Sequence, residues 1–146
     1  MSERADAVIV RLARIEERQG LEDLQRRASL ANEQDRPHLE AHPDAIDLPA
    51  EQIANGEVFV AEFGERVAGF AALIGGELDG LFVEPELWRR GIGGALVAHA
   101  AHLARQRGLA LTVTANPVAL EFYQRCGFSI EGETQTRFGP GVRMSR

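Results

Sequence analysis

The chain has 146 residues, of which 45% are hydrophobic and 26% are charged, and these values are typical of one globular domain. The formal net charge of −6 at pH 7 argues against duplex DNA or RNA as the main partner, because nucleic-acid binding needs a basic surface. The single cysteine, Cys126, excludes an internal disulfide framework and a thiolate-rich zinc site. The longest nearly apolar run, Val67 to Ile74, is too short to cross a bilayer, and the start of the chain lacks the apolar core of a secretory signal. We therefore expect a cytoplasmic protein without a membrane partner.

The first third of the chain predicts a strand, a helix and an irregular region. Ala7 to Leu12 is short and β-branched, which favours a strand. Residues 14–31 carry apolar side chains at steps of three or four, which predicts an amphipathic helix, and Gly20 is expected to separate the strand's exit from it. Residues 32–49 are broken by three prolines, with one short helix expected after Pro49. This region is a candidate lid or specificity loop.

The remaining elements follow from glycine turns and apolar periodicity. Three strands joined by short turns predict an antiparallel meander, and they are Val58 to Glu62, Val67 to Ile74 and Glu77 to Val83. A helix from Ile92 to Leu103 and a strand from Leu109 to Thr114 then complete a strand–helix–strand crossover, whose two strands should run parallel. The chain should end with a helix over 116–125 and strands over 128–135 and 142–145, around a turn at 138–141.

The turn Arg89-Arg90-Gly91-Ile92-Gly93-Gly94 lies where a strand passes through glycines into a helix. Such a turn presents free backbone N–H groups at the positive end of a helix dipole, which suits a phosphate-bearing ligand. A dinucleotide fingerprint would need a small residue at Leu96, and a nucleotide-hydrolase loop would need a lysine near the turn, so both motifs are excluded. A helix start that only requires a tight turn is the simpler alternative.

Two sequence blocks together identify a family. The first block is Leu81-Phe82-Val83-Glu84-Pro85, followed by the glycine turn. The second block is Asn116-Pro117-Val118-Ala119-Leu120-Glu121-Phe122-Tyr123-Gln124-Arg125-Cys126-Gly127-Phe128. Together they resemble the GCN5-related N-acetyltransferase superfamily. The resemblance implies one α/β (α+β) N-acetyltransferase domain over residues 1–146, with a mixed, mostly antiparallel twisted sheet and helices on both faces. It also implies acetyl-CoA as co-substrate and no metal.

The resemblance places the pyrophosphate of acetyl-CoA on the glycine turn and the pantetheine arm on unpaired backbone of the preceding strand. One N–H of that strand would polarise the thioester carbonyl. Trp88 stands where the family usually has Gln or Arg, so the side chain that grips the phosphates stays open. The implied cofactor-binding residues are Leu81, Phe82, Val83, Arg89, Arg90, Gly91, Ile92, Gly93, Gly94, Asn116 and Tyr123.

Two residues are catalytic candidates. Tyr123 would protonate the departing CoA thiolate, and its alternative is a packed aromatic residue. Glu77 would deprotonate the amine, directly or through water. Asp79 lies two residues further along the same strand face, where a second carboxylate could raise the pKa of the first. The alternative for Glu77 is a solvated strand end, and the alternative for Asn116 is a helix N-cap.

The expected reaction is acetyl transfer from acetyl-CoA to a primary amine of a small molecule or peptide, by direct attack in a ternary complex. A catalytically silent acyl-CoA sensor or interaction module with the same fold is the alternative, and a homodimer is possible. His99 is expected to be a packed residue, and Arg26-Arg27 a solvated helix face. Cys126, at the end of a helix, is not expected to form a covalent acetyl intermediate.

Overall fold

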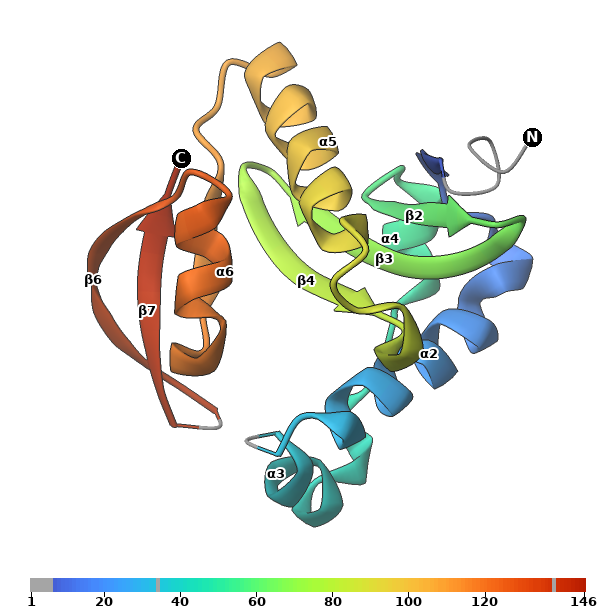
Figure 1. Ribbon diagram of the computed structural model, residues 1–146, viewed down its shortest axis with the longest axis horizontal. Helices are drawn as coiled ribbons and strands as arrows, with labels where there is room; N and C mark the ends of the chain where they lie inside the picture. The colour runs from blue at the N-terminus through green and yellow to red at the C-terminus, as the bar shows by residue number, and fades with distance from the viewer. Residues whose placement is uncertain (1–6, 34, 138) are drawn as a thin grey trace. The chain divides into compact units, whose positions relative to one another are not determined.

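The computed structural model describes residues 7–33, 35–137 and 139–146 (Figure 1). Its seven strands form one sheet in the order β1-β2-β3-β4-β5-β7-β6. β4 and β5 pair in parallel, whereas β1–β2, β2–β3, β5–β7 and β6–β7 are antiparallel. The predicted mixed, mostly antiparallel sheet and the predicted parallel crossover are therefore confirmed.

The chain divides into two compact units, and β3, β4 and α5 contribute residues to both of them. The first unit comprises the described residues up to Ala72 together with Gly80–Leu96, and the second comprises Leu73–Asp79 and Val97–Arg146. The strands are β1 (Val8–Leu12), β2 (Val58–Phe63), β3 (Arg66–Ile74), β4 (Glu77–Val83), β5 (Thr112–Ala115), β6 (Ser129–Thr136) and β7 (Gly139–Ser145). The α-helices are α2 (Arg18–Ala31), α3 (Arg36–Ala41), α4 (Ala50–Ala54), α5 (Ile92–Gln106) and α6 (Leu120–Arg125). Four 3-10 turns complete the set, namely η1 (Ile15–Glu17), η2 (Pro43–Ala45), η3 (Pro85–Leu87) and η4 (Pro117–Ala119).

The core of the first unit forms between α2 and the strands β2 and β3. Leu21 and Leu24, one turn apart on α2, belong to the same buried cluster as Val58, Val60 and Phe70. The apolar residues whose spacing predicted α2 are therefore residues that the helix buries. The expected role of Gly20 was wrong, because Gly20 lies inside α2 and the helix is entered earlier, through η1.

The proline-broken region holds more regular structure than its sequence predicts. It contains α3 and η2 before the expected helix α4. Pro37 does not prevent α3 from forming, because it falls in the first turn, where a backbone N–H has no partner within the helix in any case. The backbone of Leu48 is tied to α2 at both of its polar groups. Its N–H donates to Glu22 Oε2 at 2.8 Å, and its carbonyl accepts from Arg18 Nε at 2.6 Å. The end of this region is therefore fastened to α2.

The second unit contains the parallel β4–β5 ladder and the β6–β7 hairpin. The ladder pairs Glu77 with Thr112 and Leu78 with Val113, so β5 begins three residues later than predicted. β7 begins at Gly139, inside the predicted turn. Gly141 lies against Thr136 and Thr114, and a Cβ at this position would approach their methyl carbons to 2.8 and 3.0 Å. Glycine thus lets the strand continue where a turn was expected. In the described part of the chain no helix is long and apolar enough to span a membrane.

We expect Gly69→Ala to destabilise the protein, because the added Cβ would lie 2.7 Å from the backbone oxygen of Phe82. Overpacking against backbone costs about 2 kcal/mol, which thermal and urea unfolding will show as a lower Tm and a lower midpoint. Gly20→Ala is the matched control, because nothing lies within 4 Å of its Cβ and alanine favours a helix interior by about 1 kcal/mol. Equal Tm shifts for the two variants would contradict this packing.

Candidate active site

The turn between β4 and α5 carries backbone donors that the protein itself does not use. Along α5, the first backbone N–H that donates a hydrogen bond is that of Ala95, and its acceptor is Gly91 O at 3.0 Å. The N–H groups of residues 89–94 donate to no acceptor in the described part of the chain. Arg89, Arg90 and Gly91 are exposed. The free donors expected from the glycine motif are therefore present, at the positive end of a helix of fifteen residues.

The backbone of this turn is held in an uncommon conformation. Gly91 has φ +81°, which glycine adopts without steric cost, and Arg89 has φ +66°, which few residues with a side chain adopt. Local strain of this kind persists only where the surrounding structure fixes it, and it gathers at ligand-binding segments. The conformation of Arg89 is thus a second feature that marks the turn.

Trp88, the residue that departs from the family pattern, braces the segment before the turn. Its indole Nε1–H donates to Val83 O at 2.9 Å, and its backbone N–H donates to Pro85 O at 3.3 Å. One carbonyl of the strand expected to bind pantetheine therefore already accepts a hydrogen bond, although a carbonyl can accept a second one. No sequence pattern predicts this contact, because an indole can donate to any nearby carbonyl.

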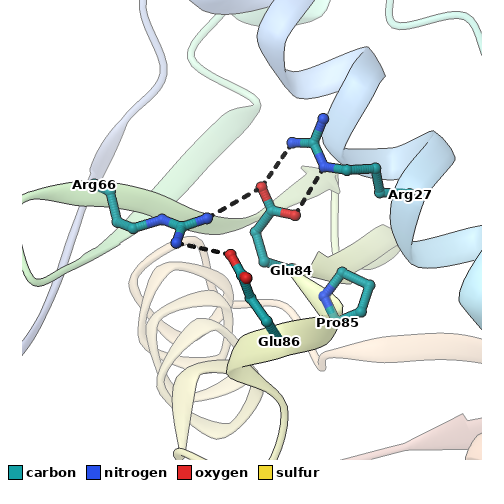
Figure 2. A pocket seen from close by; sticks show the side chains of 5 residues that line it. All are labelled: Arg27, Arg66, Glu84, Pro85 and Glu86. Atoms are coloured by element: carbon teal, nitrogen blue, oxygen red, sulfur yellow. Dashed lines mark hydrogen bonds and ion pairs between the residues drawn. The ribbon is translucent and has the colours of Figure 1, made fainter.

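Glu84 is the one buried polar or charged residue in the described part of the chain, with an exposed fraction of 6%. Arg27 of α2 donates to both of its carboxylate oxygens, at 3.0 and 2.6 Å (Figure 2). Arg66 of β3 lies 3.7 Å from Glu84 and 2.8 Å from Glu86. These side chains and Pro85 line a shallow pocket of about 340 Å³. Arg27 lies on an exposed helix face, as expected, but the sequence did not predict its partner Glu84, whose hydrogen bond raises the pKa of the guanidinium.

In the second unit, Glu77 lies beside a basic partner. Arg143 of β7 places Nη1 3.4 Å from Glu77 Oε2 and donates to Thr114 Oγ1 at 2.6 Å. Asp79 is exposed. The ion pair described at Glu77 is thus with a guanidinium. Sequence reasoning did not single out Arg143 as a neighbour of Glu77, because it comes from the last strand of the chain.

Tyr123 is packed among aromatic rings of the second unit. Its exposed fraction is 8%, and its ring meets those of Phe122 and Phe128 edge-on, with centroids 5.1 and 5.3 Å apart. Burial raises the pKa of the phenol, and the neighbouring Cys126 raises it further. The phenol therefore carries its proton throughout the physiological pH range. These contacts match the alternative considered for Tyr123, a packed aromatic residue. The same burial keeps its hydroxyl protonated.

Asn116 also matches its simpler alternative. Its Oδ1 accepts a hydrogen bond from Val118 N at 2.7 Å, which caps η4. Burial raises the pKa of the Cys126 thiol, which keeps it in the unreactive protonated form. Burial also lowers the pKa of His99, with a smaller contribution from His102, so His99 is neutral at pH 7.

The sequence and the fold are similar to those of known acetyltransferases. The model of the "Acetyltransferase (GNAT) family" matches residues 21–128. Peptidyl-lysine N-acetyltransferase YjaB from Salmonella typhimurium is 38% identical over 72 residues, which cover 49% of this chain and 48% of that protein. The chain thus spans about half the length of the curated relatives it matches.

Two solved structures share the fold over nearly the whole chain. Apo-form YjaB from Escherichia coli has a TM-score of 0.72 at 25% identity, covering 95% of this chain and 97% of that one. PaiA N-acetyltransferase from Thermoplasma acidophilum, solved in complex with coenzyme A, has a TM-score of 0.73 at 19% identity, covering 96% of this chain and 99% of that one.

The burial of Tyr123 predicts a late phenol titration. Tyr123 is the one tyrosine of the chain, so tyrosinate absorbance reports on it alone. Because its folded pKa lies above the ordinary value of about 10, its contribution to stability is fully present below that pH and is lost as the pH rises further. We expect absorbance and circular dichroism to change together, well above pH 10. A tyrosinate signal that appears near pH 10 while the protein is still folded would contradict the observed burial.

Proposed function

The chain belongs to the acetyltransferase (GNAT) family, and on this basis we propose that residues 1–146 act as one domain that transfers the acetyl group of acetyl-CoA to a primary amine. The observation that carries the proposal is the set of unbonded N–H groups at residues 89–94, which lies inside the matched part of the chain. A pyrophosphate would satisfy these donors and would meet the positive end of α5. The PaiA relative solved with coenzyme A supports this ligand.

Backbone and side chains on either side of the turn would complete the cofactor site. Arg89 and Arg90 are exposed and would add charge-assisted hydrogen bonds to the phosphates. Leu81, Phe82 and Val83 lie beyond the two residue pairs of the β4–β5 ladder, which supports their proposed contact with pantetheine and the thioester oxygen. Asn116 is the remaining residue proposed to contact the cofactor, and its Oδ1 also caps η4.

In the proposed reaction the ammonium first loses a proton, and the neutral amine nitrogen attacks the thioester carbon. The carbon–sulfur bond then breaks to leave the acetylated amine and a CoA thiolate, while the second proton of the nitrogen passes to solvent. Glu77 would accept the ammonium proton through water, because Arg143 holds one of its oxygens. Tyr123 would donate a hydrogen bond to the thiolate. Full transfer of its proton is unfavourable, since a phenol with a raised pKa is a weaker acid than a thiol with a pKa of about 8.5. Tyr123 would therefore stabilise the leaving group mainly through that hydrogen bond.

A lysine side chain of a peptide is the first acceptor to test, because a relative is named a peptidyl-lysine N-acetyltransferase. The net charge of −6 suits a cationic acceptor. All 16 basic residues of this chain are arginine, so it contains no lysine that it could acetylate in itself. Acetyl-lysine found after a reaction must therefore come from the acceptor.

We expect the protein to bind CoA in calorimetry and to release free thiol from acetyl-CoA in the presence of a lysine-containing peptide. The same peptide with its lysine replaced by arginine and its N-terminus blocked is the matched control, and mass spectrometry locates the acetyl group. Binding of CoA without thiol release on any peptide or small amine would instead support the silent sensor. Absence of CoA binding would contradict both functions.

We expect Tyr123→Phe and Glu77→Gln each to lower kcat by about 100-fold, the usual contribution of a positioned proton donor or acceptor. The dissociation constant of CoA should stay the same in Glu77→Gln, because Glu77 is not a proposed cofactor contact. Asp79→Asn is the control for Glu77→Gln, since it neutralises an exposed carboxylate on the same strand. Phenylalanine keeps the aromatic packing of Tyr123, so an unchanged kcat would show that packing is its only role.

A further inference from the structure

The cluster of Arg27, Glu84, Arg66 and Glu86, called the Glu84 clamp below, joins three separate elements of the first unit (Figure 2). Arg27 reaches Glu84 from α2, Arg66 reaches it from β3, and Glu84 itself follows directly after β4. The Arg27 contact is bidentate, so it fixes the orientation of the carboxylate as well as its position. The clamp therefore sets where the chain leaves β4.

The burial of Glu84 makes this contact obligatory. Without Arg27 the buried carboxylate would keep only the longer ion pair with Arg66, at 3.7 Å, so its charge would be poorly compensated and the chain around it would rearrange to bring the charge toward water. The two arginines are different, because about half of each side chain is exposed and each can be solvated without the other. Loss of Arg27 is therefore expected to displace Glu84 before it disturbs α2.

A short series of hydrogen bonds connects Glu84 to the phosphate turn. The N–H of Glu84 donates to Ala68 O on β3 at 2.8 Å, and its carbonyl accepts from Leu87 N at 2.9 Å. Trp88 then closes the segment with its bonds to Pro85 and Val83. Arg89, with its positive φ, follows directly. Trp88, the last hydrogen-bonded residue of the anchored segment, is therefore adjacent in sequence to Arg89, the first residue of the turn whose N–H is free.

We propose that the Glu84 clamp is a positioning device that holds the N–H donors of residues 89–94 in place for the pyrophosphate, with Glu84 and Arg27 as its positioning residues. This inference rests on the proposed function, since the ligand is that of the proposed reaction. Donors that are fixed before binding need no ordering when the ligand arrives, so the clamp acts on cofactor affinity and not on the chemical step.

The test uses three variants of the clamp, namely Arg27→Met, Glu84→Gln and the double variant that carries both changes. The control variant is Arg26→Met. Arg26 is an exposed neighbour on the same helix, and the same loss of charge there controls for general electrostatics. Arg27→Lys keeps the charge but not the bidentate geometry, and it also serves if Arg27→Met fails to fold. CoA is the probe in calorimetry, and the KM for acetyl-CoA and kcat are measured with a lysine peptide.

We expect Arg27→Met to weaken CoA binding about tenfold and to raise the KM for acetyl-CoA equally, with kcat unchanged at saturation. Arg26→Met should stay within about twofold of the wild type, and Arg27→Lys should be intermediate. The double variant should be no weaker than the weaker single variant, because the two residues act as one unit. A lower Tm with unchanged CoA affinity, or additive losses, would overturn the proposal.

Trp88 supplies a readout that needs no ligand. It is the one tryptophan of the chain, and it lies between the clamp and the turn. In the free protein we expect its fluorescence to shift to the red and to be quenched more readily by acrylamide in Arg27→Met, but not in Arg26→Met. If the wild type does not bind CoA, the proposed function fails, and Trp88 still shows whether the clamp holds the turn. Unchanged Trp88 fluorescence would overturn the anchoring itself.

Discussion

The backbone donors at the start of α5 are the constraint around which the first unit is built. Every helix leaves its first N–H groups without intrahelical partners, and most helices satisfy them with a capping side chain or with water. Here residues 89–94 carry no cap within the described residues, and Gly91 and Arg89 adopt positive φ angles that leave the turn exposed. A helix start that retains both the free donors and the strain is suited to an anion supplied from outside.

Such a turn is only useful if it is rigid, and the residues before it supply that rigidity. Glycines remove side chains from the approach to the ligand, but they also make the backbone permissive. The bonds of Glu84 and Trp88 offset this freedom. Glu84 attaches the segment between β4 and α5 to β3 and α2, and Trp88 bonds back to Val83 and Pro85. The buried charge of Glu84 has the same consequence: its ion pairs are costly to break, so the chain has one stable path into the turn.

The two catalytic candidates of the second unit show how environment limits what a residue type can do. Tyr123 is buried and its phenol pKa is raised, so the role we propose for it is a hydrogen bond to the thiolate and not full proton transfer. Glu77 pairs with Arg143 through one carboxylate oxygen, so in the proposed water-mediated step the other oxygen would accept the proton. In both cases the residue type was read from sequence, and the neighbour that qualifies its role was not.

The sequence by itself determined the features that depend on near neighbours along the chain. Apolar periodicity gave α2 and α5, glycine and proline gave most of the turns, and the strand–glycine–helix pattern gave the free donors of residues 89–94. Local conformation follows local sterics and spacing, so these features could be predicted. Gly20 and Pro37 are exceptions: each residue type predicts a break, but a helix tolerates each at its observed position. Only the tertiary structure decided which charges meet. Arg27 and Glu84 lie 57 residues apart, and Arg143 reaches Glu77 from the last strand, because such pairs depend on how strands and helices pack and no spacing in the sequence encodes them.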